Sequence, residues 1–319
     1  MEPEIMNMLA YADSIASWVS SDIEVFIDFM EWAVNYDNNY DFNGLLTIYG
    51  YGRSYGITRP YVKTEEKWIA AGTRMARKKH PFYIVKRNMD VNGKVSSYSL
   101  EILYDISDTT AEYYIDRAVY PKDIGLKCDA LMLGAPRKIV YSERASSSLA
   151  MYSMKYDVFY VRNGHGEFSD IFIKICHEYI IYAIHRQLTN KEILKREGLR
   201  PPKPPEKREK GGKDNFINRG YFTMLSWWAN LAICDRVEIP YVINDDREGI
   251  YAELRRLRDA GEDERPQIEI PEDYILPDRW KEYSIEQIKT DIGLCVYGGR
   301  AAFELFMHGV AKLRKVMSV

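Results

Sequence analysis

Apolar residues recur at three- and four-residue intervals along the first part of the chain, from residue 4 to residue 36. This spacing is typical of amphipathic helices, in which one face is buried. Ser20, Ser21 and Asp22 interrupt the pattern, and all three are residue types that commonly cap the N-terminus of a helix. We therefore expect two consecutive helices, the second of which ends near Asn35.

The residues that follow are predicted to form a turn. Residues 35–43 are rich in Asn, Asp and Tyr, and the apolar run at residues 45–49 is punctuated by Gly50, Gly52 and Gly56. No helix is evident after these glycines, which argues against a phosphate-binding loop.

A short helix and a β-hairpin are expected next. Residues 65–76 predict the helix, which carries Trp68. Residues 82–86 and 98–104 have the composition of strands, and the sequence Asp-Val-Asn-Gly at residues 90–93 supplies turn residues between them. The chain up to about residue 115 therefore reads as an α+β unit.

The second half is predicted to be mostly helical. Residues 119–138 show little periodicity, and residues 151–161 alternate weakly as strands do. The helix expected at about 167–187 is apolar nearly all round and is therefore expected to be central. Residues 198–214 are rich in proline and charge and predict an exposed loop. Further helices are expected at 216–232, 247–259 and 284–315.

Composition limits the class of protein. The 319 residues are 46% hydrophobic, which is ample for two packed domains. No apolar run approaches the roughly 20 residues that span a bilayer, and the first residues are acidic rather than a basic leader, so we expect a cytoplasmic protein without membrane contact. The four cysteines form no C-x-x-C pair, which argues against a zinc knuckle or a redox motif.

The net charge of −3 gives no general reason to expect nucleic-acid binding, but positive charge is concentrated between residues 74 and 87. Basic side chains can contact phosphates while interleaved aromatic rings stack on unpaired bases, as in sequence-tolerant single-strand binding. Alternatively, the basic residues form the solvated end of a helix, and one of the two aromatic rings in the segment faces the core. The segment contains Arg74, Arg77, Lys78, Lys79, His80, Phe82, Tyr83, Lys86 and Arg87.

Tyrosine is frequent, with 25 residues, and several lie beside the glycines and beside Arg53 and Arg59. These side chains are able to form a stacking platform, or to cover a half-wet surface with their hydroxyls outward. The group comprises Tyr36, Tyr40, Tyr49, Tyr51, Tyr55 and Tyr61.

The order of these features resembles the N-terminal domain of ArdC-type antirestriction proteins. The residues that carry the resemblance are 39–43 with the run 45–49, Trp68, a basic cluster, and residues 104–109 (Tyr-Asp-Ile-Ser-Asp-Thr). At 78–81 this chain has Lys-Lys-His-Pro where the family has a glycine-flanked lysine-rich turn. The resemblance implies a single-stranded-DNA-binding domain at 1–118. The residues implied in nucleic-acid binding are Arg74, Arg77, Lys78, Lys79, Lys86, Arg87, Phe82, Tyr83, Tyr40, Asn43 and Trp68.

In that family the second domain resembles a zinc metallopeptidase with an H-E-x-x-H helix. Here His177 and Glu178 occupy the first positions, but position 181 is isoleucine. Two histidines on one helix can bind the same zinc ion only when they are four residues apart in the sequence. His185 lies about 12 Å further along the helix axis and cannot serve. Residues 221–232, where the family places an acidic ligand, contain no Asp or Glu.

We therefore expect residues 119–319 to form a degenerate zincin-like domain with no catalytic residue, metal or cofactor, in which Glu178 and His177 are the remaining candidates for base and ligand. Two alternatives stay open. In the first alternative, His177-Glu178 is a chance dipeptide on a core helix. In the second, a metal site is formed by residues that are distant in sequence, with His165 as one candidate.

The predicted function is single-stranded-DNA binding by an α+β protein of mobile-element type, with a role in antirestriction implied by the resemblance. An alternative function, from a different class, is that of an interaction protein that inhibits a host defence or nucleic-acid enzyme, with the loop at 200–213 as its docking segment. A third is an active metalloenzyme, which requires a metal. The expected partners are therefore single-stranded DNA and a host protein.

Overall fold

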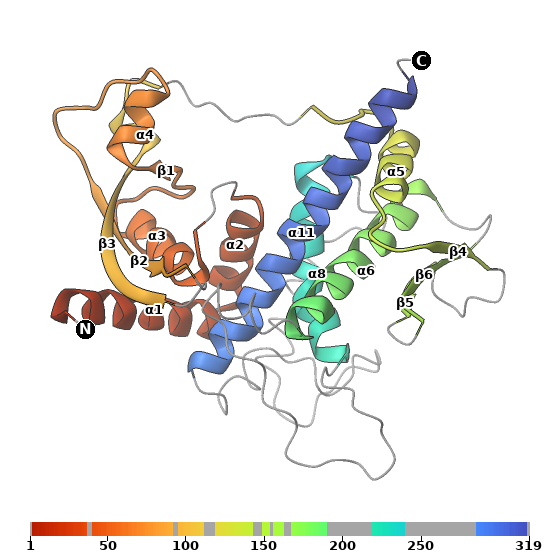
Figure 1. Cartoon of the computed structure of the whole chain (residues 1–319), viewed down its shortest axis with the longest axis horizontal. Helices are drawn as coiled ribbons and strands as arrows, with labels where there is room; N and C mark the ends of the chain where they lie inside the picture. The colour runs from red at the N-terminus through yellow and green to blue at the C-terminus, as the bar shows by residue number, and fades with distance from the viewer. Residues whose placement is uncertain are drawn as a thin grey trace, which may run out of the picture.

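The computed structural model describes residues 2–36, 40–91, 95–111, 119–142, 149–153, 156–162, 167–189, 219–239 and 285–317, and these form an α+β fold (Figure 1). Several predicted features lie outside the described residues: residues 92 and 93 of the hairpin turn predicted at 90–93, the loop at 198–214, the helix at 247–259 and His165.

The first two helices confirm the predicted break. Helix α1 spans Pro3–Ser21 and helix α2 spans Ile23–Val34. Asp22 separates them in an extended conformation, and its side chain accepts hydrogen bonds from the backbone N–H groups of Glu24 and Val25. A carboxylate at this position satisfies donors that the first turn of a helix leaves unpaired.

Helix α3, Phe42–Ser54, contains the apolar run together with Gly50 and Gly52, a stretch to which the sequence pattern assigned no helix or strand. Asp41 caps it by accepting a hydrogen bond from Gly44 N at 2.8 Å. A side chain at Gly50 would place its Cβ 2.6 Å from Cδ1 of Ile15, so this glycine is needed for the close approach of α3 to α1. Tertiary packing therefore outweighs the low helix propensity of glycine.

The predicted hairpin forms the larger part of an antiparallel sheet in the order β1-β3-β2. Strand β1 is Val62–Lys63, β2 is Pro81–Met89 and β3 is Val95–Asp105, with Phe82 paired to Leu103. The short helix α4, Glu65–Ala70, ends earlier than predicted. A 3-10 turn, Ile106–Asp108, follows β3.

The second half contains helices and a small sheet in the order β4-β6-β5, in which β4 runs parallel to β6. Helix α5, in a stretch that shows no clear pattern in the sequence, lies against the C-terminal helix. The elements are α5 (Ile124–Leu133), β4 (Ile139–Tyr141), β5 (Ala150–Ser153), β6 (Val158–Val161), α6 (Phe168–Thr189), α8 (Arg219–Arg236) and α11 (Ile285–Met317).

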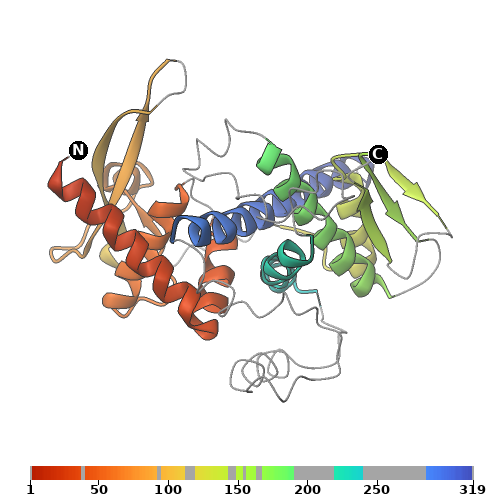
Figure 2. The same cartoon turned by 90° about the horizontal axis from the view of Figure 1, so that it is seen from below.

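Helix α11 runs between the two halves of the molecule (Figures 1 and 2). Its 33 residues span about 50 Å at 1.5 Å per residue, and it contacts α1 and α2 on one side and α5, α6 and α8 on the other. The Arg300 guanidinium donates two hydrogen bonds to the carbonyl of Ala33. One cluster of buried apolar residues includes members of both halves. The division at 118/119 stays a prediction.

Candidate nucleic-acid interface

Residues 104–109, which carry part of the family resemblance, hold neighbouring segments in place. The Tyr104 carbonyl accepts a hydrogen bond from the indole N–H of Trp68 at 2.8 Å. The buried Asp105 carboxylate accepts hydrogen bonds from the backbone N–H groups of Tyr61 and Ser107. These contacts join α4, β1 and the end of β3, so the residues of this signature have a structural role.

Asp108 positions the basic segment. Its side chain is 4% exposed, accepts a hydrogen bond from His80 N at 2.9 Å and lies 3.0 Å from Nδ1 of the same histidine. The Asp108 carbonyl accepts a hydrogen bond from Ala76 N, and Arg74 exchanges two hydrogen bonds with Thr110. Residues 74–80 are therefore fixed at several points although they form no regular helix or strand.

Three basic residues of this segment, Arg74, Arg77 and Lys78, are exposed to solvent. Among the residues that the structure describes, none of the three forms an ion pair with an acidic side chain. Their charges are therefore available to phosphate groups.

The other predicted basic residues have acidic partners. Lys79 Nζ lies 2.7 Å from Glu65 and 5.1 Å from the centre of the Tyr104 ring. Lys86 lies 3.5 Å from Glu101, and Arg87 lies 2.6 Å from Asp41. The Arg87 side chain is only 10% exposed, which makes it part of the fold as well as a candidate for ligand contact.

Four tyrosines form a group beside the basic segment, and we call Tyr11, Tyr51, Tyr55 and Tyr83 the tyrosine cluster. The rings of Tyr51 and Tyr55 stack with centres 5.9 Å apart, and Tyr11 and Tyr83 lie 5.2 and 6.3 Å from Tyr51. Tyr55 is 37% exposed, and its ring centre lies 5.3 Å from that of His80. The basic segment and the cluster therefore meet at His80.

The hydroxyl groups of the cluster lie near one another. Burial raises the pKa of Tyr11, Tyr51 and Tyr55, and repulsion from another tyrosine of the cluster raises it further in each case. The hydroxyls of these three residues therefore stay neutral at physiological pH and add no negative charge that would repel a phosphate chain. Among the sequence candidates for stacking, Tyr51, Tyr55 and Tyr83 belong to this cluster.

Tyr11 was missed because it lies in a different part of the sequence and is brought to the cluster only by the packing of α1 on α3. Its ring contact with Tyr51 depends on the same close approach that requires Gly50.

Other sequence candidates for base contact lie inside the protein. Phe82 and Trp68 are buried, because Phe82 faces α3 and Trp68 fills the space beside β1 and β3. The structure therefore does not present their faces to a base. Tyr36 and Tyr49 are also buried, and the hydroxyl of the half-buried Tyr40 donates to the Val62 carbonyl at 3.3 Å.

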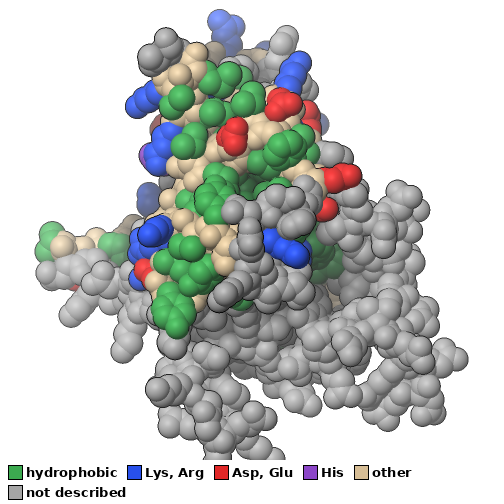
Figure 3. Space-filling model, turned by 90° about the vertical axis from the view of Figure 1, so that its right-hand side faces the viewer, with side chains coloured by type: hydrophobic (Ala, Val, Ile, Leu, Met, Phe, Trp, Pro, Cys, Tyr) green, Lys and Arg blue, Asp and Glu red, His purple; other side chains and the backbone are tan. Residues whose placement is uncertain are grey.

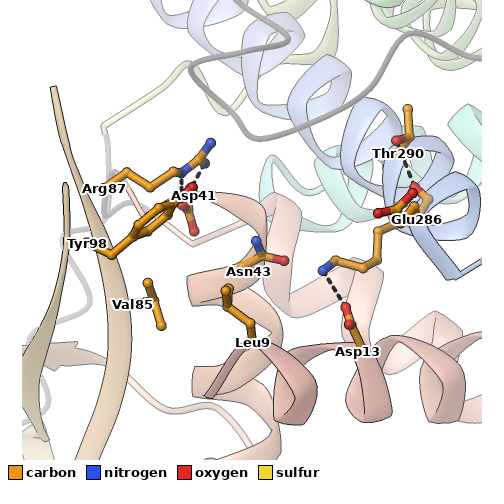
Figure 4. Close-up of a pocket in the computed structure, with 10 residues that line it drawn as sticks. Leu9, Asp13, Asp41, Asn43, Val85, Arg87, Tyr98, Glu286 and Thr290 are labelled. Carbon is orange, nitrogen blue, oxygen red and sulfur yellow. Dashed lines mark hydrogen bonds and ion pairs between the residues drawn. The ribbon is translucent and has the colours of Figure 1, made fainter. Parts of the chain in front are cut away.

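A cavity of about 330 Å³ lies between β2, β3, α1, α3 and the start of α11 (Figure 4). It brings together the predicted residues Asn43 and Arg87, which lie 44 positions apart in the sequence. The lining residues are Leu9, Asp13, Asp41, Asn43, Val85, Arg87, Tyr98, Glu286, Lys289 and Thr290.

The face of the second half that contains β4 to β6 has a different character. Exposed aromatic residues such as Tyr141 and Tyr156 lie here. On the described part of the face in Figure 3, hydrophobic side chains lie among charges of both signs. We therefore do not place a nucleic-acid interface there.

On α6, His177 and Glu178 are buried and engaged within the protein. His177 Nε2 lies 2.9 Å from Oγ of Ser226 on α8, and its ring contacts Trp227 edge-on. Glu178 Oε2 accepts a hydrogen bond from Tyr152 N at 2.7 Å, which ties α6 to β5. Both side chains therefore help to hold the second half together.

These residues do not fit a zincin metal site. Ile181, at the position that requires a second histidine, is buried, and α8 offers the hydroxyl of Ser226 to His177 instead of a carboxylate. In the described part of the chain, no group of three or more His, Cys, Asp or Glu side chains is arranged to hold a metal ion. Also within those residues, no helix is long and apolar enough to cross a membrane.

No protein-family model matches the chain, and no curated protein matches its sequence. Two crystal structures of the antirestriction protein ArdC from plasmid R388, one bound to Mn(II) and one metal-free, each align with 94% of this chain and 98% of their own chain. The TM-scores are 0.46 and 0.44, and the sequence identities are 12% and 14%. The similarity extends over both halves of the chain.

Proposed function

We propose that this protein binds single-stranded DNA through the basic segment, Arg74 to His80, and the adjacent tyrosine cluster. The observation that carries the proposal is that a segment with three exposed basic side chains, none with a described acidic partner, meets a partly exposed stack of tyrosines at His80, whose ring centre lies 5.3 Å from that of Tyr55. Such a surface attracts phosphates by charge and accepts bases of any sequence by stacking, because every base has an aromatic face.

A single strand suits this surface better than a duplex. The bases of a duplex are stacked on one another, so the tyrosine cluster gains nothing from them, whereas the phosphate contacts are available in both forms. The sequence resemblance to ArdC-type proteins favours DNA and an antirestriction role in the transfer of mobile elements.

The test is the binding of a fluorescently labelled oligonucleotide, followed by anisotropy, with its duplex measured in parallel at low and at moderate salt. We expect tighter binding of the single strand and an affinity that falls as salt rises. The variant Arg77→Glu with Lys78→Glu reverses two exposed charges and should weaken binding at least tenfold, because repulsion replaces two phosphate contacts.

A matched control carries the same change in net charge. Lys122→Glu with Lys138→Glu alters two exposed lysines of the second half and should bind nearly as the unmodified protein does. Equal loss in both variants would assign the effect to net charge rather than to the basic segment. No single-strand binding at micromolar protein would refute the proposal and would make inhibition through a protein partner the leading function.

For the second half, the proposed role is structural support without peptidase activity. His177 and Glu178 contribute contacts to the fold, and Ile181 replaces the ligand that a zincin requires. Metal analysis of the purified protein tests this role. Zinc at close to one equivalent per chain, lost in His177→Ala, would overturn it.

A further inference from the structure

The cavity of Figure 4 contains a buried polar atom that lacks a hydrogen-bond partner. The side-chain oxygen of Asn43 is buried, and no described residue donates a hydrogen bond to it. Asn43 lies in the first turn of α3, between the Asp41–Arg87 pair and the Asp13–Lys289 pair. A buried acceptor without a donor is unfavourable, so the arrangement points to a ligand that supplies an N–H group.

The charges around the cavity indicate what kind of ligand fits. Arg87 and Lys289 supply two positive charges, and Asp13, Asp41 and Glu286 supply three negative charges, so the lining carries a formal net charge of −1. This balance disfavours a phosphate group and favours a neutral polar ligand.

Shape and apolar surface narrow the choice further. The volume of about 330 Å³ lies at the lower end of the usual range for small-molecule sites. Tyr98 is 36% exposed and lies opposite Arg87 in the hairpin, while Leu9 and Val85 add apolar surface. An aromatic ring, apolar walls and an amide acceptor together suit a flat heterocycle with N–H donors at its edge.

We propose that this cavity receives one nucleobase of the bound single strand, with Asn43 accepting a hydrogen bond from the edge of the base and Tyr98 stacking on its face. The inference rests on the proposed function. Alternation along β2 places Tyr83, Val85 and Arg87 on one face of the strand. Tyr83 belongs to the tyrosine cluster and Arg87 to the cavity, and about 13 Å of strand separates them.

The cavity also connects the two halves of the protein. Glu286, Lys289 and Thr290 come from α11, and Lys289 pairs with Asp13 of α1 at 2.6 Å. A base in the cavity therefore lies against both the hairpin and the C-terminal helix, which restricts the movement of one against the other.

The experiment compares Asn43→Ala and Tyr98→Ala in single-strand binding and in thermal unfolding. We expect Asn43→Ala to weaken binding about 5-fold, the equivalent of one hydrogen bond, and to leave the melting temperature unchanged or raised because an unsatisfied buried acceptor is removed. Tyr98→Ala should weaken binding about 5- to 100-fold through the loss of stacking. Asn88→Ala is the matched control, because Asn88 bonds to Ser97 and Ser99 on the other face of the hairpin.

A series of oligonucleotides with one abasic site at successive positions identifies the base. At one position the abasic site should weaken binding by the unmodified protein and have little further effect on Asn43→Ala, as expected for two changes that remove the same contact. Single-strand binding that is insensitive to Asn43→Ala, to Tyr98→Ala and to every abasic site would overturn this inference while the proposed function stands.

Titration with free nucleosides, followed by NMR, distinguishes the source of the base. Binding of a free nucleoside that is lost in Asn43→Ala, together with no binding of the strand, would refute the proposed function and assign the cavity to a free nucleoside instead. If neither the single strand nor a free nucleoside binds, both the inference and the proposed function are overturned.

Discussion

Replacing Arg74, Arg77 and Lys78 together by alanine should reduce the salt dependence of single-strand binding by a predictable amount. Each phosphate contact on a single strand releases counterions that contribute about 0.7 to the slope of log K against log salt. Because all three side chains are exposed and have no described acidic partner, each is counted as one full contact. The slope should therefore become less negative by about 2.

This change in slope is large enough to measure. Between about 50 and 200 mM salt, the unmodified protein should lose about 20-fold more affinity than the triple variant does. This factor is the fourfold ratio of the salt concentrations raised to the difference in slope, which is about 2. The assay is a set of anisotropy titrations over a salt series, with circular dichroism melting curves to show that the variant is folded.

Lys79 and Lys86 provide the comparison within the same protein. Each has an acidic partner, Glu65 or Glu101, so alanine at either position should change the slope by clearly less than 0.7. An unchanged slope in the triple variant, or an equal effect from the paired lysines, would refute the reasoning from exposed and unpaired charge.

Three further outcomes are expected. Gly309→Ala places a Cβ 1.7 Å from the Ala130 carbonyl oxygen, so α5 and α11 must separate; urea denaturation should show a loss of about 1–3 kcal/mol in the free energy of unfolding, and an unchanged value would contradict the close approach. Asp108→Ala removes the acceptor for His80 N and should lower both the melting temperature and the single-strand affinity; lowered stability with normal affinity would show that the basic segment does not depend on this anchor. Burial, with a smaller contribution from Arg186, lowers the pKa of His185, so the unfolded chain takes up a proton as the pH falls below about 6.5 before the folded chain does. Stability should therefore fall from pH 7.5 to pH 5.5 by at most about 1.4 kcal/mol per pH unit from this group, and His185→Gln should reduce that fall in urea titrations; an identical pH dependence would exclude His185 as its source.

Elements with strong local signals could be predicted from the sequence. The cap at Asp22, the paired strands of the hairpin and the long apolar helix α6 all depend on residues close together in the chain, and the structure contains each of them. Helix α5 could not be predicted, because its sequence has no clear period and its buried Lys127 is satisfied by the distant Glu238 carbonyl. Its close contact with α11 at Gly309 is likewise a long-range feature.

The candidate site was predictable in part for the same reason. The concentration of positive charge after residue 74 and the abundance of tyrosine are properties of composition, so they are visible without a structure. The departure from an H-E-x-x-H pattern at Ile181 is also visible in the sequence, because helical spacing decides which side chains on one helix can share a metal.

Only the tertiary structure decided which of these residues are accessible. Long-range pairing neutralises Lys79 and Arg87 but leaves Arg77 exposed, packing buries Phe82, and the approach of α1 to α3 brings Tyr11 to the tyrosine cluster. Local propensity depends on neighbours within a few residues, whereas burial and charge pairing depend on residues that meet only when the whole chain has folded.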